Sequence, residues 1–145
     1  MEISTEENEK LINRICESVR EAYKKNAAVS DGHRLIYEIE HLLMEVNSGA
    51  TFEQYFQWSK LEQIARIVSQ LETVGLSEAA QITREAISVA YPDGLPPAPA
   101  DKVSLSNWDG SEEQEEQLKE LAEKFTDYNG TITNKLADYA GQTGV

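Results

Sequence analysis

The sequence predicts an all-α protein, a single domain over residues 1–145 in which about six or seven antiparallel helices form one bundle. Apolar residues recur at spacings of three and four along most of the chain, which places them on one face of a helix. No segment alternates apolar and polar residues over the length of a strand. Helix-ending and helix-starting residues also stand so close together that successive helices must be antiparallel neighbours or meet at a sharp corner.

The first two predicted helices carry clear apolar faces. One runs over residues 5–28, and its apolar positions are Leu11, Ile12, Ile15, Val19, Ala22 and Tyr23. A turn at residues 30–32 caps the second helix. The apolar face of that helix is wide enough for a central place in the bundle: Leu35, Ile36, Ile39, Leu42, Leu43 and Val46. Four polar side chains are assigned to its other sides: Arg34, Glu38, Glu40 and His41.

Residues 45–59 combine a helix stop, a tight turn, a helix start and several aromatic residues. Asn47 and Gly49 tolerate the left-handed conformation that ends a helix, and Thr51 with Gln54 forms the pattern of a capping box. The aromatic residues that follow share one helical turn and are expected to anchor neighbouring helices. We interpret them as core; the alternative is a ligand pocket lined by Phe52, Tyr55, Phe56 and Trp58.

The next two predicted helices are separated by a single helix-ending glycine, Gly75. Ser59 and Glu62 are spaced as a second capping box, ahead of a helix over residues 61–74. Gly75 ends that helix in the left-handed conformation, and an Ala-rich helix starts almost at once. Its apolar positions are Ala79, Ala80, Ile82, Ala86, Ile87 and Ala90.

Residues 92–110 form a Pro-rich loop before the last helix pair, with all four prolines of the chain between residues 92 and 99. Val103, Leu105 and Trp108 predict that the loop packs on the surface, since a solvated linker has no use for them. Ser111 and Gln114 form a capping box for the next helix. Its apolar stripe is Leu118, Leu121, Ala122 and Phe125, and a break at residues 126–130 separates it from a short last helix.

Charge is the outstanding bulk property, because 26 acidic against 13 basic residues give a net charge of −13. Such an excess argues against direct binding to nucleic acid or an anionic membrane and favours a cationic partner. The acidic N-terminus lacks a signal peptide pattern, and no run approaches the length of a membrane span. These features predict a cytoplasmic protein. The single cysteine, Cys16, lies in an apolar helical pattern and is expected to be a reduced core residue.

The densest acidic segment is residues 109–127, with eight acidic residues against two lysines. On a helix, several of its carboxylates form one row, and their repulsion is easiest to understand if a cationic partner uses them. The candidate contact residues are Glu112, Glu113, Glu116, Glu120, Glu123 and Asp127. A second acidic row is expected on the first helix: Glu6, Glu9, Glu17 and Glu21. The alternative is that both rows are ordinary solvated faces.

Motifs for catalysis or cofactor binding are absent from the sequence. It has no Gly-rich phosphate loop, no nucleophile elbow and no cysteine pair. His33 and His41 are about two turns apart, too far to share a metal without other ligands. Glu45 and Glu53 could serve as an acid–base pair in principle, but they are better interpreted as a helix-end group and a first-turn acid. We therefore expect no enzyme, no cofactor and no metal.

The order of these elements resembles the bacterial DNA-mimic protein family. The resemblance rests on the Asn47–Gly49 turn followed by Phe52, Gln54, Tyr55 and Phe56, then on Gly75 after Leu71, and on the Ala-rich segment at residues 79–86. It covers roughly residues 35–139, including the Pro-containing loop and the acidic final helix pair. The turn departs from the family pattern by a longer link to Phe52, and Trp58 replaces a usual Asn.

The resemblance implies an all-helical, dimer-forming domain whose acidic surface imitates duplex DNA. Such a domain sequesters a basic DNA-binding protein, for example a transcription regulator, without catalysing a reaction. Two alternatives remain open: an immunity or antitoxin-like module that blocks a basic nuclease toxin through the same surface, and a helical domain with no mimic role.

Overall fold

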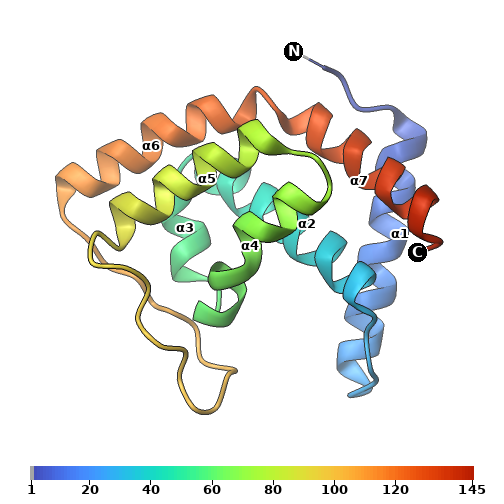
Figure 1. The fold of residues 1–145 in the computed structure, drawn as a ribbon, viewed down its shortest axis with the longest axis horizontal. Helices are drawn as coiled ribbons and strands as arrows, with labels where there is room; N and C mark the ends of the chain where they lie inside the picture. The colour runs from blue at the N-terminus through green and yellow to red at the C-terminus, as the bar shows by residue number, and fades with distance from the viewer. Residues whose placement is uncertain (1) are drawn as a thin grey trace.

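The computed structural model describes residues 2–145, which form seven α-helices and no strand (Figure 1). The all-α prediction is therefore confirmed. The helices, in chain order, are α1 (Glu6–Lys24), α2 (Asp31–Gly49), α3 (Phe52–Gln57), α4 (Leu61–Thr73), α5 (Ser77–Ala90), α6 (Glu112–Thr126) and α7 (Asn129–Thr143).

Helix α2 lies at the centre of the bundle, as its wide apolar face predicts. It packs against α1, α3, α4, α6 and α7, while α5 lies between α4 and α6. Its apolar residues, among them Ile36, Ile39, Leu42 and Val46, are inaccessible to solvent. One hydrophobic core joins these residues to those of the other helices.

The aromatic residues of α3 connect distant parts of the chain. Phe52, Tyr55 and Phe56 are fully buried. The Phe52 ring lies 5.4 Å from that of Phe125 on α6, and the Phe56 ring lies 6.2 Å from that of Trp108 in the Pro-rich loop. These are edge-to-face or tilted pairs at the separations that aromatic rings favour. The core interpretation is thereby confirmed for these three residues.

The ends of α2 and α3 differ from the predicted turn in three details. Helix α2 continues through Gly49, and Ala50 takes the left-handed conformation with a φ of 54°. Thr51 caps α3, but the Gln54 side chain donates to Glu45 Oε2 (2.9 Å) across the turn and completes no capping box. Gly49 is explained by this contact, because a Cβ there would lie 2.8 Å from Gln54 Oε1. Trp58, expected in the core with the other aromatic residues, is 58% exposed.

The start of α4 also corrects a prediction. Lys60, not Ser59, is the N-cap residue, and its N–H donates to Gln63 Oε1 (3.4 Å). Ser59 cannot cap the helix because its side chain is buried, with its hydroxyl 3.2 Å from His41 Nε2.

The corner between α4 and α5 is confirmed as predicted. Gly75 has a φ of 80°, a conformation that glycine adopts without a Cβ clash. The N–H of Leu76 donates to the Leu71 carbonyl (2.9 Å), and that of Gly75 to the Glu72 carbonyl (3.0 Å). This is the hydrogen-bonding pattern of a Schellman motif.

The end of the Pro-rich loop packs against the bundle through Leu105, Ser106 and Trp108, whereas residues 92–104 are exposed except for the partly buried Leu95 and Pro99. The Ser106 N–H donates to the Ser59 carbonyl (2.8 Å), next to an isolated antiparallel bridge between Lys60 and Leu105. Trp108 is buried and its indole N–H donates to the Ala90 carbonyl (2.8 Å). Val103 is an exception, because it is 66% exposed and contributes little to the packing that the sequence predicts for it.

Candidate partner-binding surface

Helix α6 presents one apolar and one acidic face. Its start is fixed by the predicted capping box, in which Ser111 Oγ accepts from the Gln114 N–H (3.2 Å) and Gln114 Oε1 from the Ser111 N–H (2.8 Å). Acidic residues in the first turn complement the helix dipole. The buried face is Leu118, Leu121, Ala122 and Phe125, which hold the helix against α5, α3 and α2.

The candidate contact residues of this helix all point to solvent. Each of Glu112, Glu113, Glu116, Glu120, Glu123 and Asp127 is exposed. Six ion pairs occur among residues 2–145, and none involves a carboxylate of this group. Lys119 and Lys124 on the same helix are exposed as well, without a carboxylate oxygen within the 4.0 Å of an ion pair. We call these six acidic residues the α6 acidic face; their charges are not paired within the described chain.

The tertiary structure extends the α6 acidic face toward α3. Glu53, in the first turn of α3, has its pKa raised above the ordinary value, first by partial burial and then by the carboxylates of Glu115 and Asp109. Lys119 opposes this shift. Sequence reasoning misses the cluster because Glu53 and Glu115 lie more than 60 positions apart. It relates Glu53 only to the dipole of its own helix.

The second acidic row lies on α1, and all four of its predicted members, Glu6, Glu9, Glu17 and Glu21, are exposed. Three of them have partners within the chain. Glu6 pairs with Lys10 (3.1 Å), Glu21 with Lys24 (3.4 Å), and Glu9 accepts from the Ser4 hydroxyl (2.6 Å). The α1 row is therefore more neutralised than the α6 acidic face.

The two acidic rows lie on helices that both pack against α2 but otherwise have different neighbours. Helix α1 packs against α2 and α7, whereas α6 packs against α5, α3 and α2. In Figure 1, α7 continues from the end of α6 toward α1, so the rows belong to different parts of the bundle.

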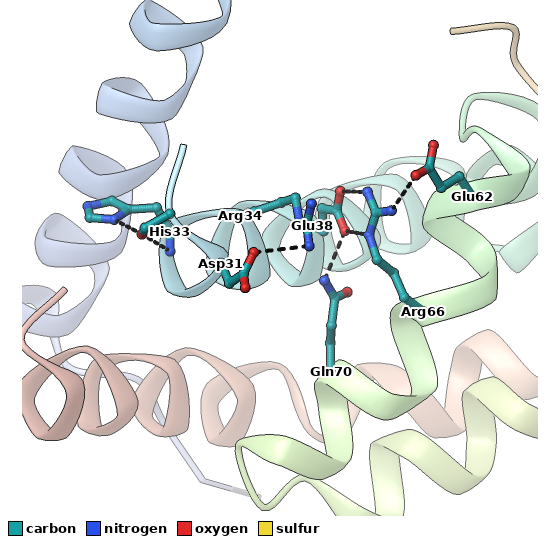
Figure 2. Close-up of polar contacts among 8 residues, drawn as sticks. Asp31, His33, Arg34, Glu38, Glu62, Arg66 and Gln70 are labelled. Atoms are coloured by element: carbon teal, nitrogen blue, oxygen red, sulfur yellow. Dashed lines mark hydrogen bonds and ion pairs between the residues drawn. The ribbon is translucent and has the colours of Figure 1, made fainter. Parts of the chain in front are cut away.

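Glu38 on α2 is the site where the structure departs most from the predicted surface. The sequence places it on a polar side of α2, but it is only 4% exposed. Arg66 of α4 donates to both of its carboxylate oxygens (2.6 and 2.5 Å), and Gln70 Nε2 donates to Oε1 (2.9 Å), as Figure 2 shows. Glu62 lies 3.5 Å from the same guanidinium. A paired and hydrogen-bonded carboxylate can be buried where a free one cannot.

The remaining reactive side chains are held in structural roles. His33 Nδ1 lies 2.6 Å from Ser30 Oγ at the start of α2. Burial lowers the pKa of His41, the ring of which is bonded to Ser59. Cys16 is buried as predicted, and burial raises its pKa to about 12, so its thiol is neutral at physiological pH. Within residues 2–145, no three His, Cys, Asp or Glu side chains converge as metal ligands do.

No helix between residues 2 and 145 has both the length and the apolar character needed to cross a bilayer.

Comparison with known proteins adds one match. The family model described as DMP19-like protein matches residues 27–142. The matched segment runs from the connection before α2 almost to the end of α7 and includes the whole of α6. No curated protein and no solved structure matches the chain.

Proposed function

The chain belongs to the family of DMP19-like proteins, the DNA mimic protein family that its sequence resembles, and from this premise we propose that it is a non-enzymatic DNA mimic. Its partner is a basic DNA-binding protein, such as a transcription regulator, which it sequesters through the α6 acidic face. The function requires neither a cofactor nor a metal. It places the protein in the cytoplasm, where such a partner meets DNA.

The observation that carries this proposal is the set of six exposed carboxylates, five on α6 and one on its C-cap residue Asp127, that have no ion-pair partner among residues 2–145. Unpaired like charges on one helix repel one another and reduce its stability. A basic partner that neutralises them gains from the same arrangement, and the attraction also accelerates encounter between the two proteins.

The amount of charge suits a short stretch of duplex. Residues 112–127 rise about 23 Å at 1.5 Å per residue, a length over which duplex DNA presents about 13 charges. Seven carboxylates lie in this segment, and Glu53 and Asp109 beside it make nine. A protein bound to DNA faces only about one side of the duplex, so one α6 surface imitates a short site. An operator-sized site needs the α1 row or a second copy of the chain, which favours a homodimer.

We expect recognition of the partner to depend on the α6 acidic face and on salt. The chain and a variant carrying E112Q, E113Q, E116Q, E120Q and E123Q are used to capture binding proteins from the native cytosol. The wild type should retain a basic DNA-binding protein and the variant should lose it. With the captured protein, the wild-type Kd should rise at least about tenfold between about 50 and 200 mM salt, and duplex DNA should compete for binding.

A matched control removes the same charge elsewhere. Five exposed acidic residues that do not belong to the α6 acidic face are replaced by their amides: Glu7, Glu78, Glu85, Asp93 and Asp138. This control should capture the partner as the wild type does. The proposal is wrong if the captured protein is not basic, if both variants bind equally, or if duplex DNA does not compete. Capture of a basic nuclease would favour the immunity function instead.

A further inference from the structure

A cleft of about 590 Å³ opens between α2 and α4, on residues that the proposed function does not use. Tyr23, Arg34 and Tyr37 line it from the end of α1 and from α2. Trp58 and Lys60 line it from the α3–α4 connection, and Lys102 from the Pro-rich loop. The volume is within the range of about 300 to 1,000 Å³ that is typical of small-molecule sites.

The charge of the cleft is opposite to that of the molecule. Its lining contains four basic side chains, Arg34, Lys60, Arg66 and Lys102, against the two carboxylates of Glu38 and Glu62. The rest of the chain has nine basic and 24 acidic side chains. A cleft with net positive charge in such an acidic protein attracts anions to one place.

Both carboxylates in the lining are already engaged, which leaves the other basic groups available. Glu38 and Glu62 both bind Arg66, and this network is fixed by the buried Glu38 (Figure 2). Lys60 and Lys102 have no carboxylate within ion-pair distance among residues 2–145. Arg34 makes one 3.3 Å contact with the exposed Asp31, and its Nε is buried without a partner in the described part of the chain.

The loop residue Lys102 is held at the cleft by an uncommon backbone conformation. Its φ is 57°, a value that few residues other than glycine adopt. Asp101 stabilises this turn, because Oδ1 accepts from the N–H groups of Val103 and Ser104 (3.3 Å each). The loop therefore presents a lysine toward the cleft at a cost in local strain.

Aromatic side chains border the same cleft and remain accessible. Trp58 is 58% and Tyr23 is 45% exposed, and both are among the few large apolar side chains left in solvent. The Tyr23 ring packs edge-to-face against Tyr37, with centroids 5.6 Å apart, which fixes its orientation. Exposed aromatic faces beside unpaired basic side chains suit a ligand with a planar ring and an anionic group, because the ring stacks and the anion pairs with the basic side chains.

We propose that this cleft binds a small anion that carries an aromatic ring, of the mononucleotide class. The phosphate lies against Lys60, Lys102 and Arg34, and the base stacks on Trp58 or Tyr23. Longer nucleic acids are excluded, because their further phosphates would meet the strongly acidic remainder of the surface. This site is independent of the α6 acidic face, and either proposal can fail without the other.

The test is titration of the full chain with ADP, GDP, CDP and UDP, each followed by calorimetry and by intrinsic tryptophan fluorescence, which reports on Trp58 and Trp108. At least one nucleotide should bind with a Kd below about 1 mM, a free energy of about −4 kcal/mol. The nucleoside alone, inorganic phosphate and a twelve-residue oligothymidylate should each bind at least about tenfold more weakly. The proposal is overturned if no nucleotide binds, or if any of these three ligands binds as tightly as the best nucleotide.

Two variants locate the site. The double variant K60Q/K102Q should weaken nucleotide binding at least tenfold. W58A should weaken the binding measured by calorimetry, and the fluorescence of its remaining Trp108 should not change with nucleotide. The control K119Q/K124Q makes the same charge change on exposed lysines of α6 and should leave the Kd unchanged. Circular dichroism melts verify that each variant is folded; an unfolded W58A is replaced by W58L. Equal loss of binding in both lysine variants would show general attraction rather than a site, and would overturn the proposal.

Discussion

Glu38 and Glu40 show how strongly its hydrogen-bond partners decide whether a buried carboxylate stabilises the fold. Glu38 is buried but receives three hydrogen bonds, two from Arg66 and one from Gln70. Glu40 is two residues away on α2, and its Oε2 is buried without a partner among residues 2–145. Burial raises the pKa of Glu40 to about 7, and only Arg20 opposes the shift. Glu40 is thus a source of instability at neutral pH.

Replacement of Glu40 by Gln should therefore make stability less sensitive to pH. The pKa of Glu40 is higher in the folded than in the unfolded chain. Its contribution to the free energy of unfolding is therefore fully present below about pH 4.5 and is lost as pH rises through 7. The loss amounts to at most about 3 kcal/mol. Urea unfolding at pH 5 and pH 8 should show that E40Q is more stable than the wild type at pH 8 only. The variant E17Q, at an exposed position in the middle of α1, should change the stability at neither pH. A wild type and an E40Q that respond alike to pH would contradict the assignment.

At the scale of elements, short connections decide how the helices meet. Gly75 and its neighbours Val74 and Leu76 form the whole connection between α4 and α5, and the left-handed glycine turns the chain there. The last pair is joined as tightly, because only Asp127 and Tyr128 separate α6 from α7. Gly130 near the start of α7 allows the N-terminal segment to approach, since a Cβ would clash with the Glu2 carbonyl oxygen. These connections hold α6 in place and so orient its acidic face.

Alanine substitutions at two glycines should have opposite effects. Gly75 has space for a Cβ but a φ of 80°, so G75A should cost about 1 to 2 kcal/mol of unfolding free energy from backbone strain alone. Gly141 lies within α7, is exposed, and a Cβ added there would also have no atom within 4 Å. G141A should stabilise by about 0.5 to 1 kcal/mol, the helix-propensity difference. Chemical denaturation measures both; a neutral G75A would show that the corner relaxes.

The whole molecule is dominated by unbalanced charge. Its net charge is −13. Among residues 2–145 there are only six ion pairs that oppose the repulsion between carboxylates, and most of them are exposed and of small energetic value. Only the Glu38–Arg66 pair is largely removed from solvent within that range. Self-repulsion therefore opposes the compact state, and the core formed around α2 must compensate for it.

Salt should consequently stabilise the free protein. Raising sodium chloride from about 20 to 200 mM shortens the Debye length from roughly 20 to 7 Å and screens repulsion between exposed carboxylates. The Tm at pH 7 should rise by several degrees. The variant with five amides on α6 should have a smaller rise, because it has lost part of the repulsion. A Tm that falls with salt would mean that attractive pairs outweigh the excess of negative charge. Salt should therefore affect the fold and the proposed partner binding in opposite directions.

Much of the helical framework is predictable from local patterns, and the exceptions share one cause. The capping box at Ser111, the corner at Gly75 and the buried faces of α2 and α6 follow from spacing alone and are confirmed. The residues that local patterns misplace are those whose partners are distant. Ser59 is bound by His41, Gln54 by Glu45, and Glu38 by Arg66, at separations of 9 to 28 positions.

The sequence by itself determined the helices, their apolar faces, the family and the acidic character of α6, because each depends on residue type and on spacing within a few turns. Only the tertiary structure decided which polar groups are buried and where the few basic side chains gather. Arg34, Lys60 and Lys102 come from α2, the α3–α4 connection and the Pro-rich loop, and no local pattern relates them. Their proximity is a product of packing, since hydrogen bonds to the end of α3 and the start of α4, together with the buried Trp108, hold the loop beside the cleft.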